Sequence, residues 1–216
     1  MNIIILGQQG SGKGTQAELL ANKFELDHFD TGRALRQISK LQTPLGVEVN
    51  EIVMVKKELV PSRILKEILH TRLASLSREQ GIVFDGVPRN LEQAGYFEEA
   101  LLEFGRKVGR VFFVSIPEKE SLKRISKRWI CEKCKDVLIM GKDVKNEKEK
   151  CPQCGGGIMQ REDDTVAGIK KRLGIFEQET MPVINYYKEQ GILVEVDGEQ
   201  EIEKVADIIA KNLYVE

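Results

Sequence analysis

The segment GQQGSGK at residues 7–13 restricts the possible folds more than any other part of this sequence. It follows the short apolar run Ile3–Leu6 and precedes a stretch with helical character. Its spacing, G-x4-G-K, is that of a phosphate-binding loop between a strand and a helix. Glycines let backbone N–H groups surround an anion, and Lys13 adds a positive charge against the outer phosphates. We therefore expect a nucleotide phosphate here, held by a P-loop of an α/β domain.

The loop departs from the common motif immediately after its lysine. Gly14 stands where Ser or Thr usually follows, and Thr15 comes one residue later. A glycine-rich turn that merely links a strand to a helix is the alternative interpretation. The strand-like and helical segments on either side of the loop favour the phosphate site.

Four short, β-branched apolar runs predict strands that are buried on both faces. They are Ile3–Leu6, Ile82–Phe84, Val111–Ile116 and Ile192–Val196. Helical periodicity falls between and after them, over Ser62–Ser77, Leu91–Phe104 and Glu201–Leu213. Ser62 is placed as an N-cap and Gly105 as a C-cap. Strands alternating with helices predict a mostly parallel, doubly wound sheet.

Two stretches fit this alternation poorly. Residues 30–61, which we call the helical segment, hold helical pieces but no strong strand. Residues 129–160, the cysteine segment, are rich in Lys, Glu, Gly and Cys. We expect both to be insertions at the carboxyl edge of the sheet, where open α/β folds bind ligands. The core then consists of residues 1–29, 62–128 and 161–216.

The cysteines occur as two close pairs with the spacing Cys-x2-Cys-x16-Cys-x2-Cys, namely Cys131, Cys134, Cys151 and Cys154. This spacing is typical of a zinc ribbon. Four thiolates complete a tetrahedral shell and leave no position for water, so we expect structural zinc. Two disulfides are the alternative, which a reducing cytosol disfavours. The segment contains few large apolar residues, so metal binding has to supply its folding energy.

Charge and composition disfavour several classes of function. The formal net charge is −1, the sequence pI is about 6.3, and charged residues make up 31%. A nucleic-acid or membrane-surface protein needs an excess of Lys and Arg. The first residues, MNIIILGQQG, lack signal-peptide features, and no apolar stretch is long enough to span a bilayer. We expect a monomer in the cytoplasm without nucleic-acid or membrane partners.

Several further blocks, in order along nearly the whole chain, resemble the adenylate kinase family. They are GQQGSGKGTQ at 7–16, DTGRALR at 30–36, ELVPS at 58–62, FDGVPRNLEQ at 84–93, KRISKRWIC at 123–131, QREDD at 160–164, KKRL at 170–173 and VDGEQ at 196–200. The resemblance implies a parallel-sheet P-loop nucleoside monophosphate kinase fold with two inserted mobile segments. It also implies reversible phosphoryl transfer from ATP to AMP, giving two ADP, with magnesium accompanying ATP. The cysteine segment resembles the zinc-binding lid of bacterial members.

The resemblance also implies roles for individual residues. The AMP side comprises Thr31, Arg36, Glu58, Leu59, Val60, Gly86, Arg89 and Gln93. The ATP side comprises Gly10, Ser11, Gly12, Lys13, Gly14, Thr15, Arg124, Arg128 and Gln200. Arg161 and Arg172 close over the transferring phosphoryl group, and they contact AMP as well. Asp85 ends a buried run, where its carboxylate can orient magnesium-bound water. Arginines suit this work because a guanidinium binds phosphate in two-pronged fashion.

Some positions depart from the family pattern. Arg33 replaces a common Asp, Lys57 a glycine, Ser62 an Asp and Val87 a Phe. Val166 and Ala167 replace two glutamates, and the cysteine segment lacks the usual Tyr-His pair. Two other functions therefore stay open at this point: a kinase for UMP, CMP or another monophosphate, and a catalytically weakened nucleotide sensor.

Overall fold

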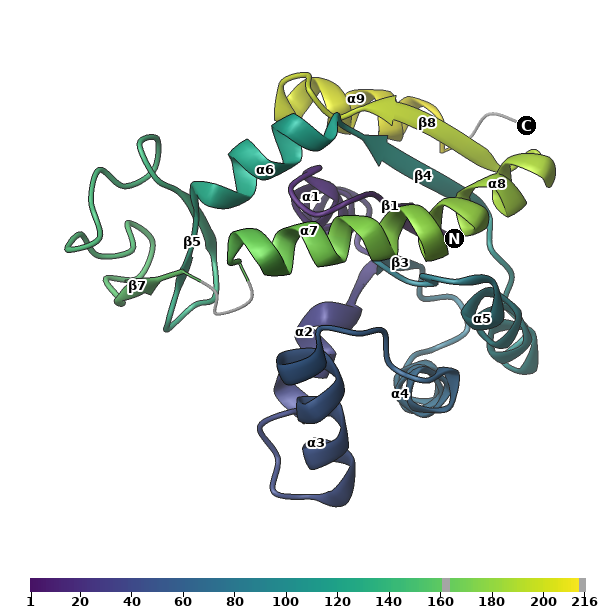
Figure 1. The fold of residues 1–216 in the computed structure, drawn as a ribbon. Helices are drawn as coiled ribbons and strands as arrows, with labels where there is room; N and C mark the ends of the chain where they lie inside the picture. The colour runs from purple at the N-terminus through teal and green to yellow at the C-terminus, as the bar shows by residue number, and fades with distance from the viewer. Residues whose placement is uncertain (161–163, 214–216) are drawn as a thin grey trace.

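The central element is a five-stranded parallel sheet with the order β2-β3-β1-β4-β8 (Figure 1). The structure is a computed structural model that describes residues 1–160 and 164–213. The strands are β1 (Asn2–Leu6), β2 (Asp27–Asp30), β3 (Ile82–Asp85), β4 (Arg110–Ser115) and β8 (Leu193–Asp197). The four predicted strands are confirmed to within one residue at each end. The parallel order confirms the predicted α/β class.

The strand β2 was not predicted, and this part of the expectation was wrong. It lies at the edge of the sheet and pairs only with β3, so a long apolar run is not required there. Only Phe29 of its four residues is buried. Asp27 instead pairs with Arg72, and polar residues at both ends hide the strand from a search for apolar runs.

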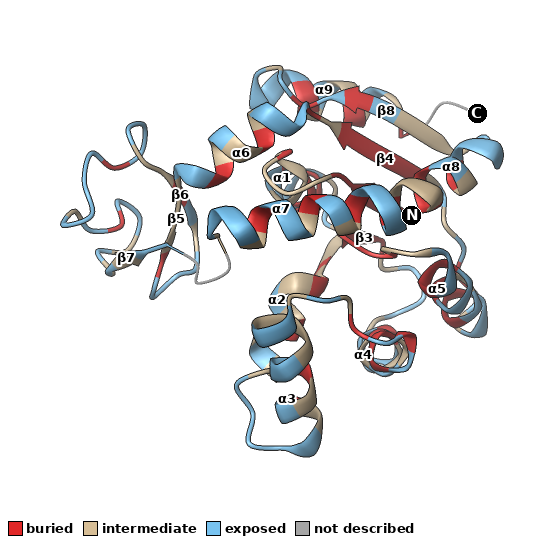
Figure 2. Cartoon of the chain, in the orientation of Figure 1, coloured by how far each residue is buried: buried red, intermediate tan, exposed pale blue. Residues whose placement is uncertain are grey.

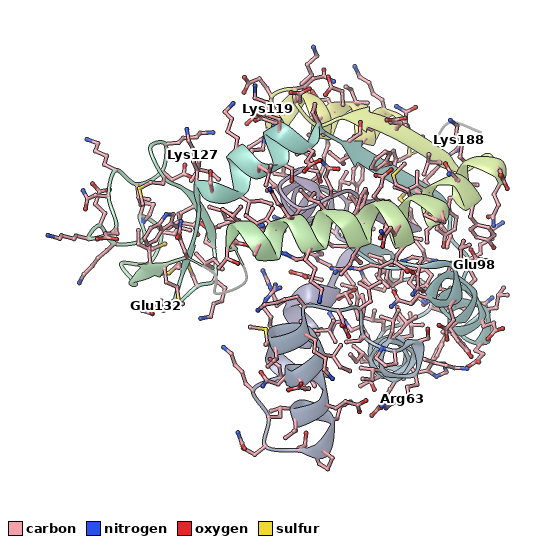
Figure 3. All side chains as sticks on the ribbon, viewed as in Figure 1. Arg63, Glu98, Lys119, Lys127, Glu132 and Lys188 are labelled. Atoms are coloured by element: carbon pink, nitrogen blue, oxygen red, sulfur yellow. The ribbon has the colours of Figure 1, made fainter. Side chains whose placement is uncertain are left out.

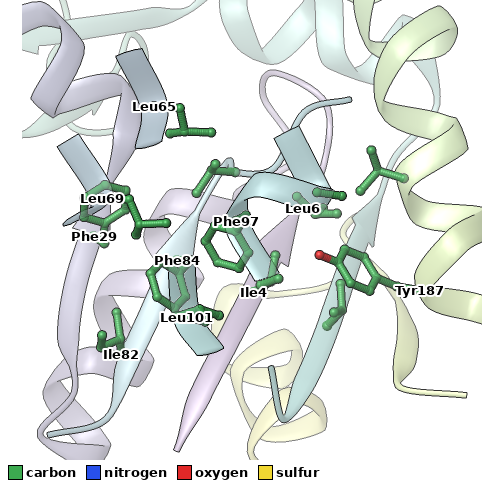
Figure 4. Close-up of a cluster of buried hydrophobic side chains, with 14 of the residues drawn as sticks. Ile4, Leu6, Phe29, Leu65, Leu69, Ile82, Phe84, Phe97, Leu101 and Tyr187 are labelled. Carbon is green, nitrogen blue, oxygen red and sulfur yellow. The ribbon is translucent and has the colours of Figure 1, made fainter. Parts of the chain in front are cut away.

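Helices cover both faces of the sheet, because β1 sends alternate side chains to opposite sides. Ile3 and Ile5 pack with α1 (Lys13–Phe24) and α9 (Ile202–Lys211). Ile4 and Leu6 pack in the larger cluster with α4 (Ser62–Ala74), α5 (Leu91–Glu103) and α8 (Met181–Glu189). Figure 4 shows Ile4, Phe84, Phe97 and Tyr187 within this cluster. The core therefore has two layers of helices around one buried sheet.

Of the two predicted helix caps, the one at Gly105 is confirmed and the one at Ser62 is not. Gly105 has φ +67° directly after α5, and the N–H groups of Gly105 and Arg106 bond to the carbonyls of Leu102 and Leu101. That pattern is a Schellman cap, so the predicted stop is confirmed. The prediction for Ser62 was wrong, since Pro61 is the N-cap of α4 and Ser62 is its first residue.

The helical segment folds as α2 (Thr31–Ile38), α3 (Pro44–Val49) and a π-helical turn (Asn50–Lys56). Asp30 caps α2 by accepting a hydrogen bond from the Arg33 N–H, and Thr43 caps α3. A small apolar cluster of Leu35, Val49, Val60 and Ile64 joins the segment to the first turn of α4.

The cysteine segment contains a three-stranded antiparallel sheet that was not predicted. Its order is β6-β5-β7, formed by β5 (Arg128–Cys131), β6 (Val137–Ile139) and β7 (Ile158–Met159). In Figure 2 this region is mostly exposed, whereas β4 is buried. Figure 3 shows Glu132 within it and Lys127 where it joins α6 (Glu118–Ser126). These strands have four, three and two residues, which is too short to give a clear apolar pattern.

The remaining helix, α7 (Val166–Ile175), continues through a π-helical turn (Phe176–Thr180) into α8. It crosses the front of the view in Figure 1, with the cysteine segment beyond its start and the helical segment below it. None of the helices in the described ranges is long and apolar enough to span a membrane.

Candidate phosphoryl-transfer site

The phosphate loop leaves β1 and enters α1 with its backbone exposed to an incoming anion. Gly10 and Gly12 have φ values of +80° and +91°, which L side chains rarely adopt. A Cβ at Gly7 would lie 2.5 Å from the Ser11 Oγ and 2.6 Å from the Val114 carbonyl oxygen. Gly12, the N-cap of α1, has no side chain that could cap the helix, and the Lys13 N–H makes only a long bond of 3.4 Å to the Ser11 Oγ, so the first N–H groups can bind phosphate oxygens.

Lys13 and Asp85 face each other at the carboxyl ends of β1 and β3. Burial lowers the pKa of Lys13 to about 8, with Arg89 and Arg128 adding to this effect and Asp85 and Asp30 opposing it. Burial by itself would raise the pKa of Asp85, but the His28 ring and the Lys13 charge hold it below its usual value. Asp85 is therefore ionised at neutral pH beside the predicted phosphate site.

Gly14 lies directly against this carboxylate. A Cβ at Gly14 would be 3.2 Å from the Asp85 Oδ2. This distance is a close contact for a side chain, so the structure gives a steric reason for glycine after Lys13. Thr15, the next residue, is exposed.

Arg89 links the end of β3 to the helical segment. Its Nε donates to the Gly86 carbonyl at 2.7 Å, where Gly86 has φ +71°. Its backbone N–H donates to the Gln93 Oε1 at 3.0 Å, and the Gln93 Nε2 donates to the Val60 carbonyl at 3.1 Å. Gln93 therefore connects two predicted monophosphate-side residues.

Several cations converge on Arg89. Burial lowers the pKa of its guanidinium, and the positive charges of Arg36 and Arg172 lower it further. Asp85 and Asp30 act in the opposite direction. Thr31 lies at the start of α2 with its side chain buried and its Oγ1 without a hydrogen-bond partner in the described structure. An excess of positive charge and an unpaired hydroxyl suit an anionic ligand.

Arg124 holds the other side of the phosphate loop. Its Nη1 donates to the Gly198 carbonyl at 3.0 Å and to the Gly10 carbonyl at 3.4 Å, and Glu120 fixes its Nε. Gln200 lies close by, after β8, and its side chain donates to the Asp197 carbonyl. Arg124 thus joins the loop to the segment that carries Gln200.

Asp164 organises two of the predicted arginines, and its individual role was missed. Its carboxylate accepts from the Arg128 Nε and Nη2 at 2.8 and 2.6 Å, and from the Arg172 Nη2 at 2.8 Å. Only 2% of the Asp164 side chain is exposed. Both arginines hold its pKa below its usual value, against the effect of burial. The block QREDD contained this residue, but nothing in the sequence distinguished it from its acidic neighbours.

His28 is a further residue beside Asp85, and no motif in the sequence connected the two. Its Nε2 lies 3.7 Å from the Asp85 Oδ2, because β2 and β3 are neighbours in the sheet. The unpredicted strand β2 therefore also concealed this contact. The other histidine, His70, lies away from this group, with its Nε2 3.0 Å from the Glu103 Oε2. Arg161 lies outside the described residues.

The four cysteine sulfurs form a compact group within the cysteine segment. All four Sγ atoms lie within 4.8 Å of one another, with Cys131–Cys154 at 3.4 Å and Cys134–Cys151 at 3.7 Å. Sulfurs about 2.3 Å from one tetrahedral ion are separated by about 3.8 Å. A disulfide bond is much shorter, at about 2.05 Å. The arrangement fits a single metal ion.

Comparisons with known proteins agree with the resemblance noted in the sequence. The family model described as Adenylate kinase matches residues 5–192. A protein named Adenylate kinase from Dehalococcoides mccartyi (strain CBDB1) is 40% identical over 204 residues, covering 94% of each chain. Proteins of the same name from Caldicellulosiruptor saccharolyticus and Archaeoglobus fulgidus are 39% and 40% identical, covering 100% and 95% of this chain and 100% and 94% of their own.

Proposed function

This chain belongs to the adenylate kinase family and is a phosphotransferase, and we propose that its active site is the carboxyl edge of the parallel sheet around Lys13 and Asp85. There it transfers a phosphoryl group reversibly from ATP to AMP, giving two ADP. The relatives carry the name adenylate kinase, which favours AMP over UMP or CMP and an enzyme over a nucleotide sensor.

The observation that carries the proposed site is the convergence of cations from separate parts of the chain. Arg36 from α2 and Arg172 from α7 both act on Arg89, while Arg128 and Arg89 act on Lys13. Phosphoryl transfer requires little covalent chemistry from the protein. The enzyme has to align the two substrates and neutralise negative charge that spreads over the phosphoryl oxygens. Converging guanidinium groups meet both requirements.

The two substrates are assigned to opposite sides of this centre. The phosphate loop takes the ATP phosphates, with Arg128 beside them, Arg124 holding the loop and Gln200 near the adenine. On the other side, Arg36 and Arg89 take the AMP phosphate, while Thr31, Gln93 and the backbone of residues 58–60 receive the nucleoside. Arg161 and Arg172 act between the two. The contacts of Gln93 with Arg89 and Val60 support this division, because they join the phosphate and nucleoside parts of the AMP side.

Asp85 is the group that we assign to magnesium. Its ionised carboxylate would hold water bound to the cation that accompanies ATP, and that cation neutralises phosphate charge. The charge of Lys13 helps to keep this carboxylate ionised by lowering its pKa.

The four cysteines would hold zinc in a structural role. A sulfur shell of four leaves no position for substrate or water, so catalysis would not involve this ion directly. We also propose that the cysteine and helical segments close over bound substrates, because water at the site would otherwise accept the phosphoryl group. The monomeric state and the cytoplasmic location stay predictions.

A coupled assay with magnesium, ATP and each monophosphate in turn tests the proposed reaction. AMP should be phosphorylated with a far higher kcat/KM than UMP, CMP or GMP. Omission of magnesium should abolish turnover at any metal content of the cysteine cluster. Preference for UMP or CMP would contradict the assignment of AMP, and nucleotide binding without turnover would contradict an enzymatic function.

Arg89→Lys tests the assigned sides. Lysine keeps the charge but loses the two-pronged geometry, so we expect KM for AMP to rise about tenfold or more while KM for ATP changes little. Arg78→Lys, at an exposed position, is the matched control. A rise in KM for ATP, with KM for AMP unchanged, would show that the two sides are assigned in reverse.

A further inference from the structure

The helix α7 contacts the helical segment through the side chain of Lys171. The Lys171 Nζ donates a hydrogen bond to the Lys56 carbonyl, and it lies 3.8 Å from the Glu58 Oε1. Lys56 is the last residue of the π-helical turn, so the contact lies where the helical segment returns to the core. The Lys171 side chain is 47% exposed, and it reaches across from a different element.

The backbone at this return point has a sharp turn. Lys57 adopts φ +58°, an uncommon conformation for a residue with a side chain, and the Glu58 N–H bonds to the Ile52 carbonyl. Three residues later the Val60 carbonyl accepts from Gln93. Contacts from the core therefore hold this stretch at both ends, Lys171 at Lys56 and Gln93 at Val60.

The same helix is also joined, through Asp164, to the start of strand β5, which leads into the cysteine segment. Arg172, the residue after Lys171, shares Asp164 with Arg128 of β5. In Figure 1, α7 starts near the cysteine segment and passes above the helical segment. At neighbouring positions 171 and 172, α7 therefore makes a direct polar contact with the helical segment and an indirect one, through Asp164, with Arg128 at the start of β5.

We propose that Lys171 is a positioning residue for the monophosphate: it fastens the backbone of residues 56–58 to α7 and so sets the distance from the AMP-binding stretch to Arg172. This inference rests on the proposed assignment of residues 58–60 to AMP. An ammonium group donating to a carbonyl makes a charge-assisted bond, stronger than a neutral one. Without it the turn samples positions further from α7, and a smaller fraction of molecules can bind AMP productively.

Lys171→Met is the variant that tests this role, because methionine keeps much of the length and the helix propensity but cannot donate. KM for AMP should rise about three- to tenfold, while kcat and KM for ATP stay within about twofold. Lys171→Arg, which retains a charged donor, should restore KM for AMP to near its original value. Lys170→Met removes the same charge from the exposed neighbouring position and should change none of the three constants.

Two results would overturn the role of Lys171. One is an unchanged KM for AMP in Lys171→Met. The other is a change of similar size in all three constants, with kcat lowered and both KM values raised, which indicates a general structural effect. Arg36→Ala, measured in parallel, tests the proposed AMP side separately. If Arg36→Ala raises KM for AMP and Lys171→Met does not, the AMP site stands and the Lys171 proposal fails. If Arg36→Ala leaves KM for AMP unchanged, the assignment of the AMP side itself is wrong.

Discussion

The helical segment and the cysteine segment are both inserted into one sheet-based core, yet different interactions hold them together. The helical segment has a small apolar cluster, formed by Leu35, Val49, Val60 and Ile64, that continues into α4. Among the described residues, the fully buried members of the cluster in the cysteine segment are Leu138 and Val144 besides two cysteines, with Trp129, Met140 and Ile158 partly buried against them. A short segment with so little apolar area to bury needs another source of folding energy, such as metal binding.

This difference has a consequence for function. If the two segments serve opposite sides of the same phosphate loop, damage to either one should impair a different substrate, whereas damage to the loop should impair both. Because one segment depends on packing and the other on thiolates, different treatments should affect them separately.

The largest effect should come from Lys13 of the phosphate loop, because the two segments are assigned to opposite sides of this loop and it serves both substrates. Lys13→Met should lower turnover by at least about 10³-fold, because the loop loses its charge against the phosphates of ATP. The fold should persist, since the side chain serves the site and not the core. Thermal unfolding and activity of one sample provide the measurement. Near-normal turnover in a folded variant would contradict the shared centre.

Removal of the metal should produce the next largest effect, confined to the cysteine segment at first. We expect turnover to fall about 10²-fold as Arg128 loses its position beside Asp164, and hydrogen exchange should increase in residues 129–160. The helical segment should keep its protection. Replacement of zinc by cadmium or cobalt should leave turnover within about twofold. Turnover that depends on which ion is bound would place the cluster in the active site.

Leu35→Ala provides the corresponding test on the helical segment. Loss of this buried side chain should destabilise the segment by about 2–3 kcal/mol and raise KM for AMP about tenfold, with KM for ATP nearly unchanged. Hydrogen exchange should now increase in residues 30–61 and not in residues 129–160. Leu41→Ala, at an exposed position of the same segment, is the control. Equal loosening of both segments would show that they are not independent.

The smallest effect is electrostatic: Asp30 in the helical segment and Arg128, which directly precedes the cysteine segment, should act on Lys13 in opposite directions. Burial is the main reason why the pKa of Lys13 falls from 10.5 to about 8; the charge of Arg128 adds to this lowering, and the charge of Asp30 opposes it. Lys13 must be protonated to hold phosphate, and kcat/KM reports the pKa values of groups in the free enzyme. We therefore expect kcat/KM to decline as the pH of the solution rises through the Lys13 pKa of about 8. Arg128→Gln should move this decline to higher pH, and Asp30→Asn to lower pH.

The quantity to compare is the pH at which kcat/KM falls on the alkaline side, and it does not depend on the absolute activity of each variant. Shifts of about half a pH unit are expected for charges that act over a distance at a partly solvated site. Asp207→Asn, on the exposed side of α9, should leave this pH unchanged. Shifts in the same direction for Arg128→Gln and Asp30→Asn would contradict the opposite effects of these two charges on Lys13.

Much of the core and the nature of the site were accessible from local patterns in the sequence. Apolar runs identified β1, β3, β4 and β8, because central strands buried on both faces need consecutive apolar residues. The edge strand β2 was missed because only one of its residues has to be buried, and the strands of the cysteine segment were missed because they are only two to four residues long. The phosphate loop and the cysteine pairs were visible, since their chemistry demands a set spacing over a few residues.

What the sequence by itself determined is therefore local: the phosphate loop, the central strands and the metal-binding spacing. The tertiary structure alone decided which distant residues meet, such as His28 with Asp85, Asp164 with Arg128 and Arg172, and Lys171 with Lys56. The physical reason is that such contacts depend on strand order and on the path of α7. Neither leaves a periodic pattern in the residues that make the contact.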